Sequence, residues 1–137
     1  MGKTFTAPFA QTPKTASGIC SAGVDISTNT PANTVLLGTA GVEGAIVTKL
    51  TAVPMGTVTA SGLYLFISKN SGQTKHVVDT ALMSAWTSDV ATAAPVSVFE
   101  RITESTPIRL EASDQLYVGT GVAAAAGVVF NGEWTDY

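Results

Sequence analysis

The clearest fold signal in this chain is the segment Leu63-Tyr64-Leu65-Phe66-Ile67-Ser68, followed by Lys69-Asn70-Ser71-Gly72-Gln73 and then by Thr74-Lys75-His76-Val77-Val78. The first six residues are mostly aliphatic, aromatic or β-branched, and such residues favour a strand. The next five are polar and include a glycine, which is typical of the turn between two paired strands. This segment therefore predicts a β-hairpin that turns at residues 69–73.

Further segments with strand character follow one another along the chain, with turn residues between them. They are residues 19–26, 33–37, 45–53, 57–60, 96–103, 107–110, 116–118 and 128–134. Residues 107–110 and 116–118 are expected to pair across the turn at 111–114, and residues 81–86 are expected to form a helical turn. No helical pattern of ten or more residues separates any two strands. The chain is therefore predicted to be all-β, an antiparallel, jelly-roll-like β-sandwich of about eight strands.

The first 18 residues differ from the rest of the chain. They contain Pro8 and Pro13 and show no periodicity of a strand or a helix. Residues 1–18 are therefore expected to form an extended N-terminal arm, and residues 19–137 a single β-sandwich domain. Phe5 and Phe9 are spaced along this arm as anchors on an otherwise polar tether.

The composition excludes several functional classes. One cysteine among 137 residues rules out an intrachain disulfide framework and a zinc site with several cysteines. Seven basic residues and a net charge of −3 argue against binding to nucleic acid. The longest apolar run covers ten residues, 121–130, which is well below the roughly 20 residues that span a bilayer. No secretory signal is expected, because no apolar region follows Lys3.

The charges are sorted by sign along the chain. Residues 1–75 carry five lysines and two acids, a balance of +3, whereas residues 76–137 carry two arginines and eight acids, a balance of −6. Two solvated faces would account for this split. Alternatively, the basic arm of one subunit would lie on the acidic half of another.

The sequence contains few candidate catalytic residues. His76, the single histidine, is expected on the surface of a strand, and Cys20 is expected to be buried as a small apolar residue. The acids Glu100, Glu104, Glu111 and Asp114 cluster in sequence, and we interpret them as a solvated face that Arg101 and Arg109 neutralise. We therefore expect no enzymatic activity, no cofactor and no metal site.

Aromatic residues and the basic arm are the best candidates for a contact surface, because aromatic side chains often anchor protein interfaces. The candidate interface residues are Lys3, Phe5, Phe9, Lys14, Trp86, Trp134 and Tyr137. A core position is the alternative for either tryptophan, and an exposed one would instead favour sugar binding.

Just over half of the chain resembles a group of short virion structural proteins encoded by tailed bacteriophages. The resemblance is carried by residues 46–59 and 63–72, by residues 107–119, and by the C-terminal Glu133-Trp134-Thr135-Asp136-Tyr137. The chain resembles capsid decoration proteins in particular. This resemblance implies a small sandwich that coats or cements a capsid. The resemblance supplies no site residues, and it does not include the N-terminal arm.

These observations lead to one expected function and two alternatives. The expected function is a virion protein that decorates and stabilises a phage capsid, made in the host cytoplasm and placed on the capsid surface. Its expected partners are the major capsid protein and copies of itself, with a trimer favoured, and no nucleic acid or membrane. A tail, fibre-base or head–tail connector component is the first alternative, and a carbohydrate-binding module is the second.

Overall fold

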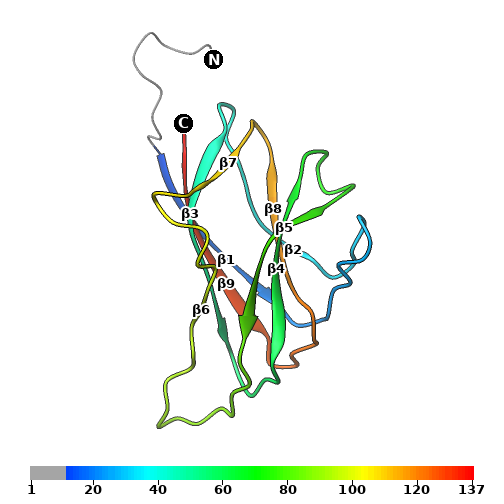
Figure 1. The fold of residues 1–137 in the computed structure, drawn as a ribbon, viewed down its shortest axis with the longest axis vertical. Coiled ribbons are helices and arrows are strands. Elements are labelled where there is room, and N and C mark those ends of the chain that lie inside the picture. The colour runs from blue at the N-terminus through cyan, green and yellow to red at the C-terminus, as the bar shows by residue number, and fades with distance from the viewer. Residues whose placement is uncertain (1–11) are drawn as a thin grey trace.

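The structure is a computed structural model that describes residues 12–137, and these residues form nine β-strands and no helix (Figure 1). The strands are β1 (Thr12–Cys20), β2 (Val35–Thr39), β3 (Ala45–Pro54), β4 (Ser61–Ser68), β5 (His76–Met83), β6 (Ser97–Val98), β7 (Ile108–Leu110), β8 (Gln115–Thr120) and β9 (Val128–Asp136). The predicted all-β class is confirmed.

The strands form two antiparallel sheets that pack face to face. One sheet has the order β1-β9-β3-β6, with β7 also paired to β3, and the other has the order β2-β8-β4-β5. β6 and β7 both lie on the side of β3 that faces away from β9, so they act as two pieces of one edge strand. The chain passes from one sheet to the other at most connections. This is the connectivity of a jelly roll, and the predicted jelly-roll-like sandwich of about eight strands is confirmed.

The predicted hairpin forms between β4 and β5, which pair antiparallel from Ser61 opposite Met83 to Ile67 opposite His76. Its turn is held by side chains, because the Ser68 hydroxyl accepts a hydrogen bond from the Gly72 amide at 2.8 Å. Gly72 has a φ of +87°, a conformation that glycine adopts without steric cost. The predicted turn therefore lies between two strands that do pair.

The predicted boundary of the N-terminal arm is wrong for residues 12–18, and so is the start of the first strand at residue 19. Residues 12–20 form β1, which pairs with β9 along its whole length from Thr12 opposite Asp136 to Cys20 opposite Val128. These residues have no strand periodicity of their own, and β9 imposes the strand by hydrogen bonding. Pro13 is tolerated because β1 is an edge strand. The arm up to residue 11 lies outside the described residues.

Two other local predictions are corrected by pairing between distant segments. Residues 81–83 belong to β5 rather than to a helical turn, because pairing with β4 continues to Met83. Residues 108–110 do not pair with β8. β7 joins β3 in one sheet and β8 joins β2 and β4 in the other, so the turn at 111–114 crosses between the sheets. Of the strand expected at 96–103, Ser97–Val98 alone is assigned as β6.

The core lies between the two sheets and is filled by residues from nearly every strand. Its largest fully buried side chains include Leu50, Leu63, Leu65, Phe99 and Phe130. Phe99 and Phe130 pack with their ring centroids 6.5 Å apart. Strand β3 alternates buried and partly exposed residues along most of its length, as expected for a strand with one face on the core.

Candidate functional site

The sequence-predicted interface residues do not come together in one place. Lys3, Phe5 and Phe9 lie outside the described residues. Lys14 is exposed on β1, and Tyr137 is partly exposed at the C-terminal end of the same sheet. Asp136 and Tyr137 lie at the Ala45 end of β3. Trp86 forms a β-bridge with Val58, which follows the opposite end of β3 at Pro54. Since β3 spans ten residues, Trp86 lies roughly 30 Å from the C-terminal end.

Both tryptophans pack against the core. Trp134 is 6% exposed, and its ring lies directly against Gly38 of β2, so it offers almost no surface to a partner. Trp86 is half-buried against the core, and its backbone exchanges two hydrogen bonds with Val58, at 2.9 and 3.0 Å. The core alternative considered for the two tryptophans is therefore the one that the structure supports.

The potential nucleophile and base are placed as the sequence predicts. Cys20 is buried, its thiol donates a weak hydrogen bond to the carbonyl of Val118 at 3.5 Å, and burial raises the pKa of the thiol to about 11. A thiol with this pKa is protonated at neutral pH and is a poor nucleophile. His76 is exposed at the start of β5.

The clustered acids separate into two groups in space. Asp114 is buried in the turn between β7 and β8, where Lys69 Nζ donates to Asp114 Oδ2 at 2.7 Å and lies 3.7 Å from Glu111. The hydrogen bond to Asp114 raises the pKa of Lys69. Glu100 and Glu104 precede β7 in the chain, and both are exposed. Within residues 12–137, no three His, Cys, Asp or Glu side chains are grouped so that they can hold a metal ion.

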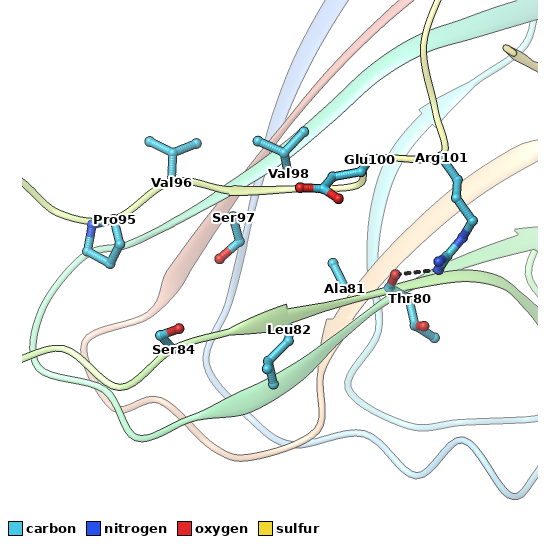
Figure 2. A pocket seen from close by; sticks show the side chains of 10 residues that line it. All are labelled: Thr80, Ala81, Leu82, Ser84, Pro95, Val96, Ser97, Val98, Glu100 and Arg101. Carbon is cyan, nitrogen blue, oxygen red and sulfur yellow. Dashed lines mark hydrogen bonds between the residues drawn. The ribbon is translucent and has the colours of Figure 1, made fainter.

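A hollow on the described surface lies where the two sheets meet at one open edge. It has a volume of about 410 Å³, and one wall is the second half of β5 while the other is the segment 95–101 that contains β6 (Figure 2). β5 is the last strand of its sheet, and β6 is the last strand of the other. We call this hollow the edge groove. It is lined by Thr80, Ala81, Leu82, Ser84, Pro95, Val96, Ser97, Val98, Glu100 and Arg101.

The edge groove has small side chains inside and apolar side chains on its two rims. Figure 2 shows Ala81 and Ser97 pointing toward one another across the gap, whereas Val96 and Val98 point away from it on one side and Leu82 on the other. The rim residues are strongly exposed: Leu82 to 72%, Val96 to 57% and Val98 to 45%. Small residues inside the gap leave room for a side chain from elsewhere.

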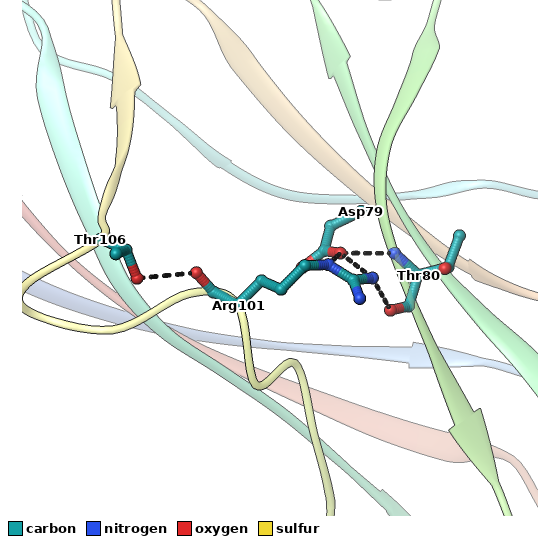
Figure 3. Close-up of polar contacts among 4 residues, drawn as sticks. All are labelled: Asp79, Thr80, Arg101 and Thr106. Atoms are coloured by element: carbon teal, nitrogen blue, oxygen red, sulfur yellow. Dashed lines mark hydrogen bonds and ion pairs between the residues drawn. The ribbon is translucent and has the colours of Figure 1, made fainter.

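One end of the edge groove is closed by an ion pair between the sheets. The Arg101 guanidinium donates through Nε to Asp79 Oδ1 at 2.9 Å and through Nη2 to the Thr80 carbonyl at 2.8 Å (Figure 3). The Asp79 side chain is buried, and its second oxygen has no hydrogen-bond partner within the described chain. Thr106 holds the backbone of Arg101 in turn, at 2.9 Å. Arg101 therefore joins the two walls of the groove.

Sequence reasoning missed the groove, although its residues carried a partial signal. Val96 and Val98 alternate with Ser97 in a segment that was predicted to be a strand. Leu82 was assigned to a helical turn, so its outward position on an edge strand was not recognised. That the edges of the two sheets face each other depends on the topology, which no local pattern encodes.

No protein-family model, curated protein or solved structure shows a significant match to this chain. Helices able to cross a membrane are likewise not found in the part of the chain that the structure describes.

Proposed function

We propose that this protein is a structural component of a tailed-phage virion, which decorates and stabilises the capsid as a homo-oligomer with a trimer favoured. The resemblance of residues 45–83 and 104–137 to such virion proteins is the starting point. The observation that carries the proposal furthest is the edge groove, with its exposed rims at Leu82, Val96 and Val98. Exposed apolar side chains around a groove suit contact with another chain.

The way in which the protein uses its charges supports a structural role. The two buried carboxylates, Asp79 and Asp114, are each engaged by a basic side chain, Arg101 and Lys69 respectively. Both contacts join segments far apart in sequence and fix the turns around the sandwich. These groups act as ties within the fold.

The jelly roll is compatible with both the proposed function and the carbohydrate-binding alternative, because viral capsid proteins and lectins use this architecture. Fold alone is an analogy and does not choose between them. The placement of Trp134 favours the virion role, since sugar stacking needs an exposed ring face and this residue is buried. The tail or connector alternative shares every structural argument with the capsid role.

Locating the chain in purified particles tests the proposal. Particles of the phage whose genome encodes the chain are purified, and mass spectrometry is used to detect it. Cryo-electron microscopy of particles labelled through a tag at Tyr137 then gives its position. We expect repeated density over the capsid shell. Density confined to the tail would replace the capsid role with the tail alternative.

Absence of the chain from particles, or a gene that lies outside any phage genome, would reject both virion roles. A glycan array with the purified protein provides the complementary measurement. Specific sugar binding there would favour the carbohydrate-binding module.

A further inference from the structure

We infer that the edge groove receives the N-terminal segment of a second copy of this chain, residues 1–11, which adds as an extended strand and inserts Phe5 and Phe9 between the two sheets. This inference rests on the homo-oligomer in the proposed function but not on attachment to a capsid.

The edge of β5 beside the groove is available for a further strand. Gly62, which lies opposite Leu82, directs its carbonyl to the amide of Gly121 on its other side, at 2.9 Å. The backbone groups of Leu82 therefore point outward, away from β4. The Thr80 carbonyl points the same way and is already bound by Arg101. An added strand would thus begin beyond Arg101 and pair at Leu82.

Long apolar edge strands are normally protected, because they pair readily with other chains. β5 is eight residues long and has exposed Val77, Val78 and Leu82, with no lysine along it. Arg101 blocks one position, and the rest of the edge next to the groove lacks a charged or proline guard. An edge of this kind is suited to strand addition, in which backbone hydrogen bonds provide affinity and pockets for alternate side chains provide specificity.

The N-terminal segment has the side-chain pattern that the groove requires. In an extended chain, Phe5, Ala7 and Phe9 lie on one face, and Thr4, Thr6 and Pro8 lie on the other. The first face would fill the gap between Ala81 and Ser97, whose small side chains leave that space open. The second face would lie beside Leu82 and the valines of the rims. Pro8 donates no backbone hydrogen bond, which an edge position tolerates.

Charge supports the same occupant. Residues 1–11 contain Lys3 and no acidic residue. Glu100 lines the groove and forms no ion pair within residues 12–137. The basic residue of the segment therefore complements the one carboxylate that lines the groove.

The strand register shows that the segment must come from another copy. Thr12 lies level with Ala45 of β3, through Asp136, whereas Val98 lies opposite Thr51. Six residues along β3 and three strand spacings across the sheet separate Thr12 from the groove, about 24 Å in total. Phe9 is three residues from Thr12 and can reach at most about 11 Å. A chain therefore cannot place Phe9 in its own groove.

The contact joins two different surfaces, the arm of one copy and the groove of the next. Repetition of such a contact closes into a ring when the rotation between copies allows it. A trimer is one such ring, so the inference is consistent with the symmetry favoured in the proposed function.

Light scattering of the purified full chain, coupled to size exclusion, tests the inference. We expect an oligomer for the wild type. The double variant Phe5→Ser/Phe9→Ser should weaken association by about tenfold or more, because buried aromatic anchors dominate interface energetics. Ser97→Phe should do the same by filling the groove. Val42→Lys, which changes an exposed residue away from the groove, should leave the oligomer intact.

Cross-linking between copies identifies the occupant directly. Phe9→Cys and Ser84→Cys are prepared as separate proteins, each with Cys20→Ala, mixed, and oxidised. We expect a disulfide-linked pair on a non-reducing gel, and none when Val42→Cys replaces Ser84→Cys. Circular dichroism of each variant establishes that the β-sheet content is unchanged.

The possible failures are distinguishable. An oligomer that survives both the phenylalanine and the groove substitutions, or cross-linking that is equal at residues 42 and 84, would overturn this inference and leave the virion role in place. A monomeric wild-type chain would overturn the homo-oligomer as well. If the Phe5→Ser/Phe9→Ser variant stays oligomeric but no longer attaches to particles, the arm binds the capsid instead of a second copy.

Discussion

The two seams of the sandwich, where an edge of one sheet meets an edge of the other, are built differently. At the closed seam β1 lies over β2, and a Cβ atom added to Gly18 would come 3.2 Å from Val35. The adjacent Gly38 of β2 meets the ring of Trp134 in the same way. At the open seam β5 and β6 leave the edge groove of about 410 Å³ between them.

The contrast extends to the exposed faces of the strands. β1 presents threonine, serine, lysine and a proline to solvent, and these protect an edge against pairing. β5 presents Val77, Val78 and Leu82. Small residues therefore serve opposite purposes at the two seams. At the closed seam glycines allow backbones and rings to approach, whereas at the open seam Ala81 and Ser97 leave space that nothing in residues 12–137 fills.

Adding bulk to each seam gives the largest expected difference. Gly38→Val should lower the free energy of unfolding by roughly 2–3 kcal/mol, because the buried Trp134 ring leaves no room for a side chain there. Ser97→Val should change it by less than about 0.5 kcal/mol, since the new methyl groups enter the groove. Urea unfolding followed by tryptophan fluorescence measures both. Equal losses would show that the open seam is packed as tightly as the closed one.

The sequence predicted pairing between neighbouring segments better than pairing between distant ones. Residues 63–78 carry both strands and the turn of the β4–β5 hairpin, and the strong strand at 45–53 became β3 almost unchanged. β1 could not be predicted, because its polar residues become a strand only through pairing with β9, more than a hundred residues away. For the same reason, residues 107–110 were assigned to the wrong partner.

Removing the link across the open seam should have the next largest effect. Arg101→Met leaves the buried Asp79 carboxylate without its cationic partner, and we expect a loss of roughly 1–2 kcal/mol in unfolding free energy. The exposure of Arg101 keeps the loss below that of a fully buried pair. Arg109→Met is the matched control, because Arg109 is exposed and forms no ion pair in the described part of the chain. Chemical denaturation of both variants provides the measurement, and similar losses would remove Arg101 from its proposed role as a tie between the sheets.

The candidate site was accessible to sequence reasoning only in part. Phe5 and Phe9 were predicted to be anchors from their spacing, which stays a prediction, and the alternation around Ser97 marked a strand. The exposure of Leu82 depends on β5 being an edge, and the groove depends on which edges face each other. Conversely, Trp134 was assigned to a contact surface because aromatic residues often serve there. Its ring is instead buried, because Gly38 has no side chain and leaves room for it.

The smallest effect concerns Cys20, which ends β1 at the closed seam. Its pKa is raised by burial to about 11, so the folded protein keeps the proton at pH values where the unfolded chain, with a thiol pKa of roughly 8.5, has lost it. The contribution of this thiol is complete below about pH 8.5 and is lost as the pH rises toward 11. The loss should be about 0.8 kcal/mol at pH 9. Urea unfolding of the wild type and of Cys20→Ala at pH 7.5 and pH 9 measures it, because the difference between the two proteins should shrink or reverse by that amount. A difference that does not change with pH would mean that solvent reaches the thiol and that the closed seam opens in solution. Labelling with an aromatic disulfide reagent distinguishes the seams independently: Cys20 should react only in urea, whereas Ser97→Cys should react at once in the folded Phe5→Ser/Phe9→Ser variant, in which the arm does not fill the groove.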